Sequence, residues 1–143
     1  MLLDTHAFLW WLFDDPKLSV TARELIKDPG HRVFVSAASV WEITTKHRLG
    51  KLPEAEEVAC VVPGWIEKAC FAALPVSPQH AQSAGGWRVA HRDPFDRMLA
   101  AQARLEELPL IITNQPCVLI DYYAAKPPYT VDLEKCTGCS NCL

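Results

Sequence analysis

The sequence lacks any long apolar run. Its continuous apolar stretches are only a few residues long, far short of the roughly 20 residues that a membrane-spanning helix needs. The amino-terminus also lacks the basic flank and cleavage site of a secretory signal, because Asp4 and His6 interrupt its apolar start. We therefore expect a cytoplasmic protein with no membrane partner.

The chain also lacks the excess of positive charge that is typical of proteins that coat nucleic acid, since its formal net charge is −3. This balance argues against a generic nucleic-acid coat. It leaves room for an enzyme whose metal ion and local basic residues hold the phosphates. Half of the 143 residues are hydrophobic and 22% are charged, which is the composition of a folded domain. The length fits one domain whose core needs no disulfides.

A disulfide framework is not indicated, although the chain has six cysteines. Three are scattered through apolar segments, as buried free thiols often are, and none need be oxidised in a reducing cytosol. The others, Cys136, Cys139 and Cys142, have the spacing that opens a bacterial ferredoxin motif, but the fourth cysteine of that motif is missing. We expect a tail without a bound cluster there. An iron–sulfur cluster or zinc is the alternative.

Short apolar segments alternate with helical periodicity along most of the chain. We expect strands at 1–3, 32–36, 71–76 and 110–113, and helices at 5–13, 19–27, 37–48, 63–70, from 77 onwards and at 93–107. Strands separated by helices predict a three-layer α/β/α sandwich around a mostly parallel sheet. Residues 1–123 are expected to form one domain without internal repeats, and residues 124–143 a tail with a cysteine-rich end.

Four acidic residues lie beside apolar neighbours or at the start of an alanine-rich helix: Asp4, Glu42, Asp93 and Asp96. A carboxylate beside aliphatic side chains is costly to desolvate unless something pairs with it. In a parallel sheet the working site lies outside the carboxyl ends of the strands, and Asp4 follows the first strand. Carboxylates that converge there would form a hard-oxygen site for Mg²⁺ or Mn²⁺, the ions that activate water and clamp phosphoryl oxygens in nucleases.

Each of these acids also has a purely local explanation. Asp4 would cap the first helix. Glu42 would pair with Lys46, four residues on, at a solvated helix face. Asp93 would cap its helix, with Asp96 as a first-turn acid facing the helix dipole. These local roles do not explain why the acids share one edge of the predicted sheet.

Four blocks of sequence resemble, in order, PIN-domain toxins of the VapC type. The blocks are LLDTHAFLW at 2–10, SVWEI at 39–43, HRDPFDRMLAAQA at 91–103 and LPLIIT at 108–113. The resemblance covers residues 1 to about 123. It implies a PIN-like fold and a ribonuclease that depends on Mg²⁺ or Mn²⁺ and hydrolyses the phosphodiester bonds of RNA. It also implies the toxin of a type II toxin–antitoxin system, a cognate antitoxin that holds it inactive, and a homodimer.

The resemblance assigns roles to single residues. Asp4, Glu42 and Asp96 match the acidic positions of the family's metal site and would hold the metal and its attacking water. Asp93 is either a further metal-site residue or only the helix cap. Thr113 matches a hydroxyl residue that lines this site, and Thr5 and Gln115 would line it as well.

Basic residues flank the acids in the sequence, independently of the resemblance. Those expected to contact RNA phosphates, unless they only form a solvated face, are Lys46, Arg48, Arg92 and Arg97.

Gln115 departs from the family pattern. Related sequences commonly carry an acid two residues after the threonine that is Thr113 here. The neutral amide removes one formal charge from the site, and an amide oxygen binds a metal more weakly than a carboxylate does. We expect weakened rather than absent activity. The alternative is a catalytically weakened or inactive binding module that pairs with an antitoxin.

Overall fold

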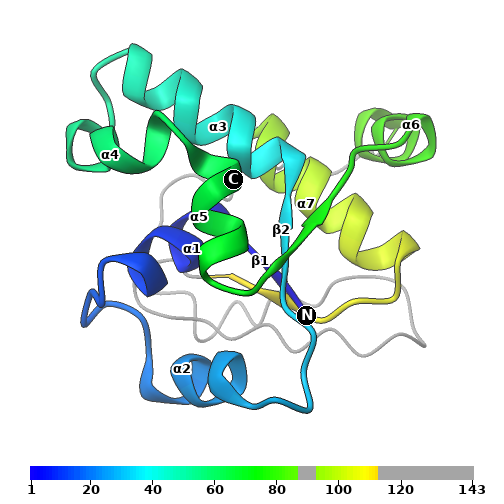
Figure 1. Ribbon diagram of the computed structural model, residues 1–143. Coiled ribbons are helices and arrows are strands. Elements are labelled where there is room, and N and C mark those ends of the chain that lie inside the picture. The colour runs from blue at the N-terminus through cyan, green and yellow to red at the C-terminus, as the bar shows by residue number, and fades with distance from the viewer. Residues whose placement is uncertain (87–92, 113–143) are drawn as a thin grey trace, which may run out of the picture.

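The sheet of this protein is parallel throughout the part of the chain that the computed structural model describes, residues 1–86 and 93–112. Its strands run in the order β3-β2-β1-β4, with helices on both faces (Figure 1). The strands are β1 (Leu2–Leu3), β2 (Phe34–Ser36), β3 (Ala72–Leu74) and β4 (Leu110–Ile111). The predicted three-layer α/β/α sandwich is therefore confirmed.

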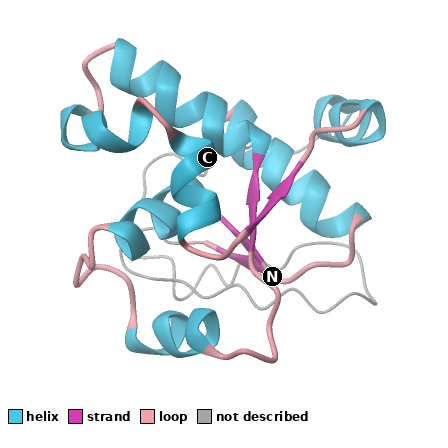
Figure 2. Ribbon diagram, viewed as in Figure 1, coloured by secondary structure: helices cyan, strands magenta, loops and turns pink. Residues whose placement is uncertain are grey.

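Helices connect each strand to the next along the chain (Figure 2). They are α1 (Thr5–Leu12), α2 (Val20–Lys27), α3 (Ala37–Arg48), the 3₁₀ turn η1 (Pro53–Ala55), α4 (Glu56–Ala59), α5 (Val62–Lys68), α6 (Pro78–Gly86) and α7 (Pro94–Leu105). Only η1 and α4 were not predicted, because segments of three or four residues are too short to show a helical repeat. No helix within the described ranges combines the length and the hydropathy that crossing a membrane requires.

The pleat of the sheet divides the core into two clusters. Leu3 is fully buried in the larger cluster together with Val35 and Ile111, its partners on the two neighbouring strands. Leu2 is equally buried but belongs to the smaller cluster, with its partner Leu110. Successive side chains of a strand point to opposite faces of a sheet. Both faces of β1 must therefore be covered, as the three-layer architecture requires.

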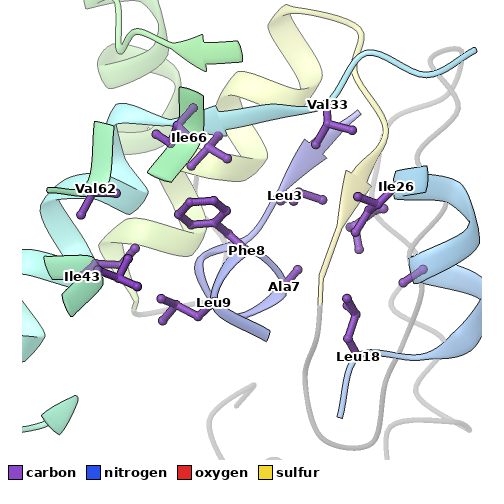
Figure 3. Packing of buried hydrophobic residues seen from close by; sticks show 14 of the residues in the cluster. Leu3, Ala7, Phe8, Leu9, Leu18, Ile26, Val33, Ile43, Val62 and Ile66 are labelled. Atoms are coloured by element: carbon purple, nitrogen blue, oxygen red, sulfur yellow. The ribbon is translucent and has the colours of Figure 1, made fainter. Parts of the chain in front are cut away.

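The larger cluster lies between the sheet and α1, α2, α3 and α5 (Figure 3). Phe8 of α1 lies at its centre, fully buried, close to Ile43 of α3 and Ile66 of α5. On the opposite face, α7 contributes Leu99 and Ala103 to the smaller cluster. Burying these apolar faces stabilises both helix layers at about 25 cal/mol per Å² of apolar surface removed from water. This packing fixes the helices of both layers relative to the strands.

Three helices begin at the carboxyl edge of the sheet. Asp4 follows β1 and caps α1, and Ser36 ends β2 and caps α3. Helix α7 leads into β4, which is parallel to the other strands, so α7 runs antiparallel to them and its cap, Asp93, lies at the same edge. This is the edge at which open parallel sheets carry their working sites.

Candidate active site at the carboxyl edge of the sheet

Asp4 is a buried carboxylate at the end of β1, with only 5% of its surface exposed. Its backbone N–H donates to the carbonyl of Ile111 at 2.9 Å, which ties it to β4. Its side chain accepts a hydrogen bond from the N–H of Ala7 at 2.6 Å. The helix cap that the local explanation predicted is thus confirmed. Its burial, however, is not explained by capping, because a side chain that is exposed to water can cap a helix too.

Glu42 of α3 is the second buried carboxylate, with 3% of its surface exposed. Its Oε2 accepts a hydrogen bond from the Thr5 hydroxyl at 2.5 Å, and its Oε1 forms an ion pair with the Lys46 ammonium. The predicted pair with Lys46 is confirmed. The predicted solvated face is wrong, because α3 turns Glu42 inwards while the preceding Trp41 is 64% exposed. Since Thr5 follows Asp4 in the chain, its bond places Glu42 at the start of α1.

Asp93 and Asp96 approach the same edge from the start of α7. Asp93 accepts hydrogen bonds from the backbone N–H of Phe95 at 2.8 Å and of Asp96 at 3.4 Å, so its cap is confirmed as well. The Asp96 residue is exposed. The rings of Trp41 and Phe95 meet edge to face with centroids 5.1 Å apart. This aromatic contact joins α3 to the start of α7 and so brings the acids of the two helices into one region.

Lys46 connects these acids electrostatically. Partial burial lowers the pKa of its ammonium, but the hydrogen bond and charge of Glu42 and the charges of Asp93 and Asp96 outweigh that effect. The Lys46 pKa is therefore raised above its ordinary value of 10.5. The ammonium is charged at neutral pH and stands in the combined field of three carboxylates from two helices. The purely local explanations do not predict this shared field.

A preformed metal cluster is not seen within residues 1–86 and 93–112, where no three acidic, histidine or cysteine side chains are grouped closely enough to hold an ion. The convergence of Asp4, Glu42 and Asp96 on one point therefore stays a prediction. The donor chemistry nevertheless fits a hard divalent cation, because carboxylate oxygens are its preferred ligands. A cation, the Lys46 ammonium, already pairs with Glu42 and interacts electrostatically with Asp93 and Asp96.

A buried hydroxyl one helical turn from Glu42 also favours a polar ligand at this site. Ser39 of α3 is fully buried. Its Oγ has no hydrogen-bond partner, and among the described residues no other buried side-chain oxygen or nitrogen lacks one. Ser39 precedes Glu42 by three residues, so the two lie one turn apart on the same face of α3. An unsatisfied buried hydroxyl costs about 1–3 kcal/mol. A polar ligand at the site, or water that it carries, would supply the missing partner.

The structure places the other predicted residues as follows. Thr5 lines the site through its bond to Glu42. Arg97 donates from its Nε to the carbonyl of Ala84 at 2.8 Å and so joins α7 to α6, whereas Arg48 is exposed at the end of α3. Contact of these arginines with RNA stays a prediction. The residues that lie outside the described ranges are Arg92, Thr113, Gln115, Cys136, Cys139 and Cys142.

Sequence reasoning missed Gln102, a fully buried amide that supports this edge. Its Oε1 accepts a hydrogen bond from the Ser36 hydroxyl at 2.5 Å, and its Nε2 donates to the carbonyl of Pro75 at 3.1 Å. These bonds attach α7 to the ends of β2 and β3. The sequence feature that could have identified Gln102 as buried is its position three residues after Leu99, within the apolar stripe of an alanine-rich helix.

Comparisons with known proteins agree with this arrangement. Residues 1–115 match the family described as PIN domain. The matched range takes in all four acids, Asp4, Glu42, Asp93 and Asp96. The chain is also similar to Ribonuclease VapC16 of Mycobacterium tuberculosis, with 37% identity over 73 residues, which are 48% of this chain and 50% of that protein. The chain thus spans about half the length of the curated relative that it matches.

Proposed function

The chain belongs to the PIN domain family, and on this premise we propose that it is a divalent-metal-dependent endoribonuclease, the toxin of a type II toxin–antitoxin system. Its substrate is RNA, whose phosphodiester bonds it hydrolyses, and its partners are a cognate antitoxin and a second copy of the chain. The similarity to a protein named Ribonuclease VapC16 supports the activity. The observation that carries the proposal is the buried Glu42 carboxylate, bonded to the residue that follows Asp4.

Asp4, Glu42 and Asp96 are the residues that would hold Mg²⁺ or Mn²⁺, with Asp93 beside them. When bound, such an ion activates water and neutralises charge on the phosphate. The fold of the chain positions the carboxylates that would bind the ion. The ends of β1 and β2 bring Asp4 and the start of α3 to one edge, and the Thr5 hydroxyl fixes one oxygen of Glu42. Basic side chains around the edge would hold the phosphates of the RNA.

RNA cleavage by the purified full chain, in Mg²⁺, in Mn²⁺ and in chelator, tests this proposal. Asp4→Asn keeps the size of the side chain but removes the charge, and we expect it to lower the cleavage rate about a hundredfold or more, since metal sites depend strongly on each ligand. Asp28→Asn is the matched control, because Asp28 is exposed and also accepts a backbone hydrogen bond, from Gly30. Equal cleavage in chelator, or by the Asp4→Asn variant, would contradict the proposed mechanism.

The second candidate is a weakened or inactive binding module that pairs with an antitoxin. It is favoured by Gln115, the neutral residue at a position where related sequences carry an acid. The same cleavage experiment separates the two candidates when antitoxin binding is measured alongside it. A chain that binds its antitoxin but cleaves no RNA in either metal is the binding module. Cleavage that stops on addition of chelator identifies the enzyme.

A further inference from the structure

The ion pair between Lys46 and Glu42 has a deeply buried acid. The Glu42 side chain is 4% exposed and that of Lys46 is 30% exposed. In the pairs made by Asp14, Asp28 and Glu106 the acidic side chain is at least 46% exposed. A carboxylate that has lost its water depends strongly on its remaining partners, whereas an exposed one does not.

Both oxygens of this buried carboxylate are in use. The Thr5 hydroxyl donates to Oε2, and the Lys46 ammonium lies against Oε1. The charges of Asp93 and Asp96 on α7 also act on the same ammonium. The positive charge of Lys46 therefore neutralises the same carboxylates that a bound metal ion would neutralise.

We propose that Lys46 is the internal counter-ion of this acidic site, that a divalent cation must displace it from Glu42 in order to bind, and that Lys46 thereby sets the affinity of the site for metal. This inference rests on the metal dependence of the proposed function. A divalent cation and an ammonium that both approach Glu42 repel each other strongly in a partly buried site, so each weakens the binding of the other. Binding of the metal and pairing with Lys46 are therefore competing states of Glu42.

The displaced ammonium has a place to go. Lys46 is partly exposed already, and its charge stands on a flexible four-carbon stem, so it can turn into solvent while the backbone of α3 keeps its position. There it becomes available to a substrate phosphate, which is the role that the sequence predicted for it. The buried Ser39 hydroxyl, one turn before Glu42 and without a partner among the described residues, adds a polar group that the incoming ion and its water can satisfy.

Binding of Mn²⁺ to the full-length chain, measured by isothermal titration calorimetry without RNA, tests this inference. Lys46→Met removes the charge and keeps the length of the side chain. We expect the variant to bind Mn²⁺ about tenfold more tightly than the wild type, the lower end of the effect that a neighbouring opposite charge has on a carboxylate. Lys46→Arg keeps the charge and should bind like the wild type. Lys51→Met, which removes a charge from an exposed residue shortly after α3, is the matched control and should also bind like the wild type.

The outcomes separate this inference from the proposed function. If the wild type binds Mn²⁺ and Lys46→Met binds it equally or more weakly, the counter-ion role is wrong and the proposed function stands. If the wild type binds no Mn²⁺, both are wrong. Lys46→Gln replaces the methionine variant if that variant does not fold, with the same gain expected. Thermal unfolding gives a second readout, because Mn²⁺ should raise the melting temperature of the neutral variant more than that of the wild type.

Discussion

At the scale of single residues, Thr5 is the side chain that links the two buried carboxylates. Its hydroxyl donates to Glu42 at 2.5 Å, and it follows Asp4 directly in the chain. Thr5 is itself buried, so water cannot easily replace its hydroxyl. The Thr5 hydroxyl therefore holds the Glu42 carboxylate against the start of α1.

Thr5→Val removes this hydroxyl and keeps the shape of the side chain. We expect the variant to lose about 1–3 kcal/mol of unfolding free energy, because Glu42 loses a buried donor. Its affinity for Mn²⁺ should fall about tenfold to a hundredfold, as is typical when a residue that orients a metal ligand is removed. Urea unfolding and Mn²⁺ titration measure the two effects. Thr5→Ser keeps the donor and should stay close to the wild type. A valine variant that matches the wild type in both assays would show that Thr5 does not position Glu42.

Local sequence patterns predicted the contacts of the acids better than their burial. The caps at Asp4 and Asp93 and the pair between Glu42 and Lys46 all depend on neighbours within a few positions, and all are confirmed. The burial of Glu42 depends on which side of α3 faces the sheet. Hydrophobicity alone would turn Trp41 inwards, but the structure exposes it and buries the glutamate. The packing of α3 against α1 and α7 determines which side of α3 is buried, and a local sequence pattern carries no information about that packing.

At the scale of elements, the positions of the main strands and helices follow from periodicity and turn residues, whereas the order of strands does not. Alternation of strands with helices predicts parallel pairing, and this is confirmed. The order β3-β2-β1-β4 places the first strand in the middle of the sheet. Short crossovers are compatible with several strand orders. The order decides which helix starts meet at one edge, so no local pattern could place the predicted site residues relative to one another.

Gln102 is the element-scale test of how α7 is attached to that edge. Gln102→Leu keeps the approximate volume of the side chain but leaves the Ser36 hydroxyl and the Pro75 carbonyl without their bonds to it. We expect a loss of about 1–3 kcal/mol of unfolding free energy for these buried groups. Gln82→Leu, at an exposed position of α6, should change stability by no more than about 0.5 kcal/mol. Chemical denaturation compares the two variants. Equal stability of both would show that these bonds do not hold α7.

At the scale of the whole molecule, the two apolar clusters explain why a costly set of carboxylates can persist. One cluster fixes α1 and α3 against the sheet, and the other fixes α7 against its opposite face. Asp4, Asp93 and Asp96 lie where α1 and α7 start, and Glu42 lies in the middle of α3, so the packing of these helices sets the backbone positions of the acids. A net charge of −3 spread over the surface would cost little, but acids gathered at one edge repel one another. The divalent cation that we propose for this edge would relieve that repulsion.

Anomalous diffraction from crystals grown with Mn²⁺ tests most directly whether these acids form a metal site. We predict an anomalous peak at the carboxyl edge of the sheet, with oxygens of Asp4, Glu42 and Asp96 about 2 Å from the ion. The Lys46 ammonium should have left Glu42 in the same crystals. Saturating Mn²⁺ that gives no peak among these three residues, with Lys46 still paired to Glu42, would contradict a metal-dependent nuclease site at this edge.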